Sequence, residues 1–320
     1  MSAEHTSIAP DVSPDGAAAL ELYARAVVAT RHAYRRLALE DPPVSELEKV
    51  AEQVTKSAKN PALSVVLALA PAARDDAARA VQAAFVVSRV ARGAADHERA
   101  LVTLALAALL VDAGRARLAS ASHIDLEVFD KLPDALDLLS PAATATLGVT
   151  GARSPLREAA SITAFEAAWL ERPRLGPLYG GALGPRLAAR LVCAARALLS
   201  CIAPKSGDAE LSPFEALHNL ATRPGADVSA LALLSNTLGP IPVGTVVELP
   251  TGAWAVVGPE AAPDPRRPVL WELVDPRGRA SEPGRELALP EAGIVRPIAA
   301  RKAHFNPAFP LVAGAGRPAK

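Results

Sequence analysis

From about residue 17 to residue 238, hydrophobic positions recur with the 3.6-residue period of amphipathic helices. Most of the apolar residues are Ala and Leu, Arg is frequent on the polar side, and Pro, Gly or Asp separates the segments. Gly114 is the expected C-cap of the helix that precedes it. The predicted longer helices cover residues 17–40, 45–59, 61–70, 75–92, 96–111, 157–171, 185–202, 213–222 and 228–238.

The pattern changes at Gly239. Residues 240–257 alternate between apolar and polar positions and contain β-branched residues, and Pro250-Thr251-Gly252 is typical of a hairpin turn. Residues 268–274 predict a third strand and residues 285–289 a fourth. We therefore predict a mainly α protein with a small C-terminal β module.

The pattern of hydrophobic and polar positions divides the chain into four parts. It predicts a disordered leader over residues 1–16, a helical bundle over 17–238, a small β-hairpin module over 239–298 and a flexible tail over 299–320. The tail is rich in Pro, Gly and Ala, a composition that buries too little apolar surface to fold on its own.

Composition narrows the class of protein. The chain has 320 residues, half of them hydrophobic, and 34 basic residues balance 34 acidic ones. Because the charges balance, we expect no binding to nucleic acid. We expect no membrane insertion either, because the apolar runs fall short of about 18 residues. The expected location is cytoplasmic. Cys193 and Cys201 stand eight apart in one predicted helix and are expected to be buried free thiols.

One stretch resembles a known metal-binding helix. In residues 109–114 the sequence reads Leu-Leu-Val-Asp-Ala-Gly, which is similar to the leucine-leucine-His-Asp frame and following glycine of HD-type phosphohydrolases, the HD-GYP branch in particular. A second match lies near the C-terminus, in order and spacing, at Ser212, Pro213, Glu215, Ala216, Leu217, Gly239, Pro242, Gly244 and Thr245. The resemblance, which extends to HDOD-like proteins, covers about residues 20–298 and implies an HD-domain-like helical bundle.

The positions that carry the family's chemistry differ in this chain. The histidine of the His-Asp pair is Val111, while its aspartate remains as Asp112. The family's first metal histidine corresponds to Arg79, and its helix-borne aspartate corresponds to Arg196. The remaining motif positions fall on Ser140-Pro141, on Thr163 to Glu166 and on Tyr179, and no histidine lies between His123 and His218.

These replacements remove most of the ligands that a two-metal centre needs. Arginine has no free lone pair for a metal ion, and valine has no donor at all. The histidines (His5, His32, His97, His123, His218 and His304) are too scattered for a zinc site. We therefore predict no metal, no other cofactor and no catalytic residue.

Three residues are candidates for a different kind of site, namely Arg79, Asp112 and Arg196. The two arginines could together bind a phosphate-bearing ligand such as a cyclic dinucleotide, since guanidinium groups suit phosphate oxygens. The alternative is an internal ion pair with Asp112, which would fill the former metal pocket, or a solvated face. Asp112 itself is either a relic metal ligand or a helix-end residue paired to an arginine.

The resemblance implies three functional hypotheses. The first is a catalytically inactive HD-GYP-like protein with a regulatory or scaffold role in bacterial cyclic di-GMP-linked signalling. Its partner would be another signalling protein, such as a diguanylate cyclase, a response regulator or a motility component. The second is a sensor that binds cyclic di-GMP in the emptied pocket. The third is a residual metal-dependent phosphodiesterase that uses Asp112.

Overall fold

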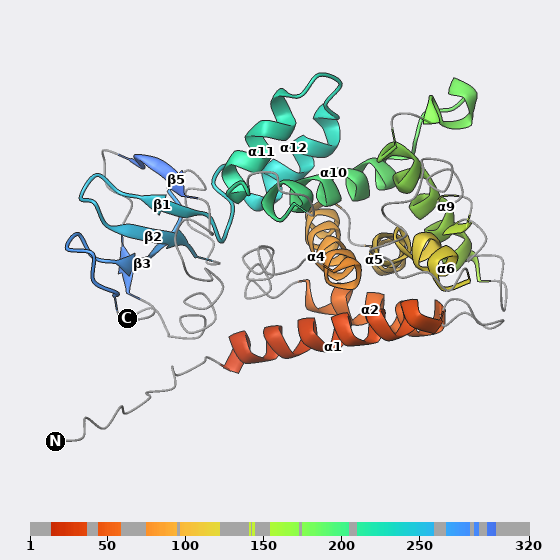
Figure 1. The fold of residues 1–320 in the computed structure, drawn as a ribbon, viewed down its shortest axis with the longest axis horizontal. Helices are drawn as coiled ribbons and strands as arrows, with labels where there is room; N and C mark the ends of the chain where they lie inside the picture. Colours follow the sequence, from red (N-terminus) through yellow and green to blue (C-terminus); the bar gives the residue numbers. More distant parts are fainter. Residues whose placement is uncertain are drawn as a thin grey trace.

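The computed structural model describes most of the helical and β regions of the chain. The described residues are 14–36, 44–58, 75–94, 97–121, 141, 143–144, 154–172, 175–204, 210–258, 267–281, 285–287 and 293–298. The predicted helix over 61–70, the tail over 299–320 and Ser140 lie outside these residues, as does most of the predicted leader. The described part is mainly helical, with a small antiparallel sheet near its C-terminal end (Figure 1).

The helices follow the predicted order closely. Their bounds are α1 Pro14–Arg36, α2 Val44–Ser57, α4 Asp76–Ala94, α5 Glu98–Leu110, α6 Ala113–Ala121, α9 Pro155–Leu170, α10 Leu187–Ile202, α11 Pro213–Thr222 and α12 Val228–Leu238, with a short 3-10 turn, η4, at Leu178–Gly181. Among the described residues, no helix is long and apolar enough to cross a membrane.

The expectation that Gly114 ends the helix containing Leu110 is wrong. Helix α5 ends at Leu110, Val111 and Asp112 form a turn, and Gly114 lies inside α6. Arg115 of α6 forms an ion pair with Asp76 at the start of α4. The turn places Asp112 at the junction of two helices.

Helices α4 and α5 form the centre of the bundle. Most residues of both are buried, 13 of 19 in α4 and 9 of 13 in α5. Helix α5 packs against α2, α4 and α9, while α4 also contacts α1, α10 and α12. The many alanines in these helices allow close approach of their neighbours. Tyr34 of α1 joins this core through its hydroxyl, which donates to the carbonyl oxygen of Leu109 at 2.6 Å. This hydrogen bond from α1 therefore also holds the C-terminal end of α5 in place.

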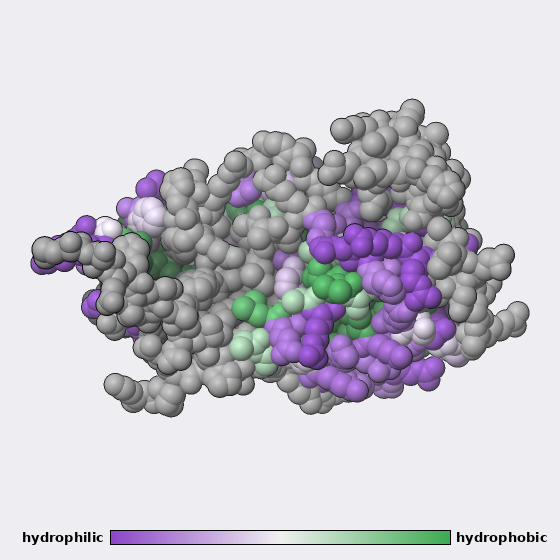
Figure 2. Space-filling model, turned by 60° about the horizontal axis from the view of Figure 1, so that its bottom comes forward, coloured by the Kyte–Doolittle hydropathy of each residue, from purple (hydrophilic) through white to green (hydrophobic). Residues whose placement is uncertain are grey.

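Ion pairs at the molecular surface join α1 to neighbouring segments of the chain. Arg31 contacts Asp75 at 2.6 Å, and Arg36 contacts Glu46 at 2.7 Å. On the side of the molecule where α1 lies, a broad hydrophilic area surrounds a smaller hydrophobic one (Figure 2). This face has the character of an ordinary solvated helical surface.

Helix α11 begins with a complete capping box. The Ser212 hydroxyl accepts from the Glu215 backbone N–H at 3.2 Å, and the Glu215 carboxylate accepts from the Ser212 backbone N–H at 2.9 Å. Ser212→Ala is expected to lower the free energy of unfolding by about 1 kcal/mol, because one N–H at the helix start loses its acceptor. Urea denaturation would measure this loss. The control is Ser229→Ala at an exposed position of α12, which should change the free energy of unfolding little. An equal loss in both variants would contradict the capping role.

The sheet has five short antiparallel strands. They are β1 Val246–Glu248, β2 Trp254–Val257, β3 Leu270–Val274, β4 Glu286–Leu287 and β5 Arg296–Ile298, in the order β4-β3-β2-β1-β5. The hairpin and the third strand agree with the sequence pattern, and β4 lies inside the predicted fourth strand. β5 was not predicted, because Arg-Pro-Ile gives no strand signal of its own and the strand exists through its pairing with β1.

Both faces of the sheet are covered. Val246, Val256, Trp271 and Ile298 form one row across the strands and belong to the same hydrophobic core as the helices. The opposite face forms a second cluster from Val247, Leu249, Ala253, Ala255, Val257 and Leu270. The sheet thus shares its core with the bundle along one face.

Candidate functional site

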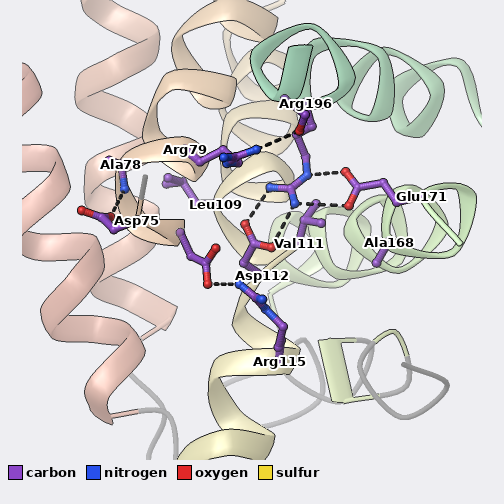
Figure 3. A network of polar contacts seen from close by, with 12 residues as sticks. Asp75, Ala78, Arg79, Leu109, Val111, Asp112, Arg115, Ala168, Glu171 and Arg196 are labelled. Carbon is purple, nitrogen blue, oxygen red and sulfur yellow. Dashed lines mark hydrogen bonds and ion pairs between the residues drawn. The ribbon is translucent and has the colours of Figure 1, made fainter. Parts of the chain in front are cut away.

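A cluster of four charged side chains, of which Glu171 is partly exposed and the other three are buried, connects the central helices (Figure 3). Arg196 of α10 binds Asp112 in a bidentate manner, with Nη1 to Oδ2 at 2.7 Å and Nη2 to Oδ1 at 2.9 Å. The same guanidinium binds Glu171, through Nε to Oε1 and through Nη2 to Oε2 at 3.2 Å. Arg196 therefore lies between two carboxylates, one from the α5–α6 junction and one from the end of α9.

Arg79 of α4 is the fourth charge of the cluster. Its side chain donates to the Ser200 hydroxyl at 2.8 Å and to the Ala203 carbonyl oxygen at 2.9 Å. These contacts cap the C-terminal end of α10, where a positive charge is favourable. Its Nε has no hydrogen-bond partner within the described part of the chain. The structure thus brings Arg79 next to Arg196 but gives it helix-end contacts instead of a direct bond to Asp112.

The four charges compensate one another. Two guanidinium groups and two carboxylates sum to zero, so the cluster as a whole needs no counter-ion. Burial by itself lowers the pKa of Arg196, but the charges and hydrogen bonds of Asp112 and Glu171 outweigh burial and raise that pKa well above its usual value. Burial and the nearby Arg196 charge lower the pKa of Arg79.

Burial and the charges of the cluster also shift the pKa values of two neighbouring side chains, Tyr34 and Cys193. Burial raises the pKa of Tyr34 well above its usual value, and the negative charge of Asp112 adds to this effect. Cys193, one turn from Arg196 on α10, has its pKa raised to about 12 by burial and then by Glu171. Its thiol is therefore protonated at neutral pH, which makes it a packing residue and a poor nucleophile.

Val111, which stands where the family has a metal histidine, lies in the hydrophobic core beside Asp112 and is only 3% exposed. Its carbonyl oxygen accepts from the Thr144 hydroxyl at 3.4 Å. The position that would carry a metal ligand is thus filled by aliphatic packing.

Glu166 lies elsewhere. This buried carboxylate accepts from the Tyr179 hydroxyl at 3.0 Å and from the Arg186 backbone N–H at 2.8 Å. Tyr179 has a φ of 51°, a left-handed conformation that costs a residue with a side chain about 1 kcal/mol. The Glu166 contact holds the tyrosine in that turn, so Glu166 supports the loop and does not join the charged cluster.

Glu171 was missed by sequence reasoning. It follows α9 directly, and a negative charge at a helix C-terminus is unfavourable in isolation. That unfavourable placement was the available signal that Glu171 has a partner elsewhere in the fold. The partner, Arg196, is 25 residues away in sequence and could not be identified from the pattern.

The cluster does not suit a divalent metal ion. Within the described ranges, no three His, Cys, Asp or Glu side chains gather in a group that would hold one. Asp112 and Glu171 are the two carboxylates at the cluster, and a guanidinium already lies between them. Arg196 supplies the positive charge there, so the arrangement is a closed ion-pair network.

No family model, curated protein or solved structure matches this chain.

Proposed function

We propose that this chain is a catalytically inactive HD-GYP-like protein, built on an HD-domain-like bundle, with a regulatory or scaffold role in bacterial cyclic di-GMP-linked signalling. It would act through contacts with another signalling protein. The observation that carries the proposal is the position of Arg196. It corresponds to a metal-binding aspartate of the family, and its guanidinium is bonded to Asp112, the one residue left of the His-Asp pair.

Electrostatics supports the loss of the metal. A two-metal hydrolase gathers several His and carboxylate ligands around two cations and their bridging water. Here Asp112 and Glu171 have a fixed cation between them, and Arg79 adds another positive charge nearby. A divalent ion would have to displace Arg196 from a site where it is 6% exposed, and would leave that charge buried without its partners.

The same contacts argue against the sensor hypothesis. Arg196 already uses Nε, Nη1 and Nη2 on carboxylates, so a phosphate would compete with buried ion pairs. Arg79 retains an Nε without a partner in the described part of the chain, which is the one feature that favours an anion. We therefore place nucleotide binding second, and residual hydrolysis third.

Metal content and turnover test the proposal. Protein purified without chelator or histidine tag is expected to contain less than about 0.1 Mn, Fe or Zn per chain, and to leave cyclic di-GMP intact with Mn²⁺, Fe²⁺ or Mg²⁺. Arg196→Asp is the matched variant, because it removes the cation and adds a carboxylate beside Asp112 and Glu171. This variant is expected to take up Mn²⁺ and to be stabilised by it, whereas the unmodified chain is not.

Three results would change this assignment. One or two metal ions per chain, with turnover that disappears in Asp112→Ala, would make the protein a phosphodiesterase. Saturable heat with cyclic di-GMP in calorimetry, lost in Arg79→Gln, would make it a sensor. In cells that overproduce this protein, the regulatory role predicts altered motility and an unchanged amount of cyclic di-GMP. A lowered amount of cyclic di-GMP would indicate an enzyme.

A further inference from the structure

The segment that connects α9 to α10 is mostly exposed and contains an unfavourable backbone conformation. Among residues 176–186, Leu178 is the one buried residue and most of the others are exposed. Three consecutive residues, Tyr179, Gly180 and Gly181, have φ angles of 51°, 64° and 84°. The left-handed conformation is unfavourable for tyrosine, so contacts with a neighbouring element must hold it there. A segment with so few buried side chains opens at a lower free energy than the bundle does.

Two aromatic side chains of α9 lie against this segment. The centroids of the Phe165 and Tyr179 rings are 6.3 Å apart, and those of the Phe165 and Trp169 rings are 5.8 Å apart. The Trp169 indole N–H donates to the Gly176 carbonyl oxygen at 3.0 Å. Both α9 rings are half-buried with the segment in place, so its displacement would uncover an aromatic surface of α9.

One buried carboxylate of α9 joins the middle of the segment to its end. Glu166, which is 2% exposed, accepts from the Tyr179 hydroxyl at 3.0 Å and from the Arg186 backbone N–H at 2.8 Å. The Arg186 guanidinium Nε lies 3.6 Å from the same carboxylate. Within the described part of the chain, all side-chain hydrogen bonds and ion pairs of Glu166 are thus made to residues 176–186. Losing this one carboxylate would therefore release the segment at two points at once.

We propose that residues 176–186 form a lid on α9, which Glu166 holds closed and which opens without unfolding of the bundle. Opening lets Tyr179 leave its left-handed conformation, and it exposes the Glu166 carboxylate and the two aromatic rings of α9 to solvent. This inference is independent of the proposed function, because Glu166 lies outside the Arg196 cluster and the lid needs no signalling ligand.

Cleavage by chymotrypsin after residue 179 tests this proposal, because the protease binds a detached, extended segment. Tyr179→Phe keeps the cleavage site and the ring but removes the hydrogen bond to Glu166. Cleavage of this variant is expected to be about ten-fold faster than that of the unmodified chain, after correction with peptides of residues 175–186 that carry either ring. Glu166→Gln should accelerate cleavage at least as much, and adding Tyr179→Phe to it should change the rate less than about two-fold.

Tyr34→Phe separates lid opening from a general loss of stability. This variant removes the buried hydrogen bond to the Leu109 carbonyl oxygen, so it should lower the free energy of unfolding and leave cleavage after residue 179 unchanged. Cleavage of the unmodified chain should also be nearly independent of urea at low concentration, since lid opening exposes little surface. Equal rates for Tyr179→Phe and the unmodified chain, or a urea dependence as steep as that of global unfolding, would overturn the proposal.

Tryptophan labelled with fluorine gives a second measurement. The chain has three tryptophans, so ¹⁹F NMR gives three signals, and Trp169→Phe identifies the signal of Trp169. In Glu166→Gln this signal should gain the solvent isotope shift of an exposed ring, while the signals of Trp254 and Trp271 stay unchanged. An unchanged Trp169 signal beside faster cleavage would mean that the segment frays without uncovering α9, which contradicts a lid.

Discussion

Replacing Arg196 with Met is expected to lower the free energy of unfolding by about 3–5 kcal/mol. The variant leaves the buried Asp112 and the three-quarters-buried Glu171 without the cation that bridges them, and it leaves Arg79 as the remaining positive charge of the cluster. Breaking a buried ion pair on one side costs far more than the pair contributes, since the partner charges lose both water and counter-ion. Urea denaturation followed by circular dichroism would measure the effect.

The matched control is Arg190→Met on the same helix. Arg190 also binds an aspartate in a bidentate manner, but the pair is about a third exposed, so solvent compensates for its loss. We expect a cost of about 1 kcal/mol or less. Equal losses in the two variants would mean that burial does not set the energy of the Arg196 network, and the interpretation of the cluster would fail.

Removing the three charges that are ion-paired to one another, Asp112, Glu171 and Arg196, is expected to have a smaller effect than removing Arg196 alone. In Asp112→Leu/Glu171→Met/Arg196→Met no buried carboxylate lacks a partner, so stability should recover most of the loss seen in the single variant. Arg79 keeps its contacts with Ser200 and Ala203 in this triple variant. Failure to recover would show that the network positions the helices in a way that apolar packing does not replace.

The second large effect is expected for Trp271→Ala, at about 3–5 kcal/mol. Trp271 is 1% exposed and belongs to the row of the sheet that shares the helical core. Truncation to alanine removes the largest fully buried side chain of the described residues and leaves a cavity on the bundle side of β3. Because the core is shared, the loss should appear in the helical signal of far-UV circular dichroism, in a single transition.

Trp254→Ala is the control for this experiment. Trp254 is the same residue type on the neighbouring strand but is only partly buried, so we expect a smaller loss of about 1–2 kcal/mol. If Trp271→Ala unfolds the sheet and leaves the helical transition unchanged, the β module folds independently. That outcome would support the division of the chain at residue 239 into two separate units.

Much of the secondary structure could be predicted because it depends on local signals. The helical period, the proline breaks and the hairpin turn at Pro250–Gly252 are each contained within a few residues. The predictions failed where a distant contact decides the backbone. The turn at Val111 and Asp112 lies next to the Arg115–Asp76 ion pair, which joins α6 to α4, and β5 depends on its pairing with β1.

The same division applies to the candidate site. The sequence placed Arg79, Asp112 and Arg196 as candidates and left open whether they form a ligand site or an internal ion pair. The distances between α4, the α5–α6 junction and α10 decide between a ligand site and an internal ion pair. Helical periodicity in the sequence does not give those distances. Glu166 and Glu171 differ by five positions on one segment, yet only Glu171 reaches Arg196.

By itself, the sequence determined a mainly helical chain with a β region after residue 239, and it determined that no histidine lies between His123 and His218. Those properties follow from residue identity and local periodicity. Only the tertiary structure decided that Arg196 lies between two carboxylates, that Arg79 caps α10, and that Arg190 pairs with Asp227. Charge pairing across helices depends on how the helices pack, because electrostatic energy is set by distance and burial in three dimensions.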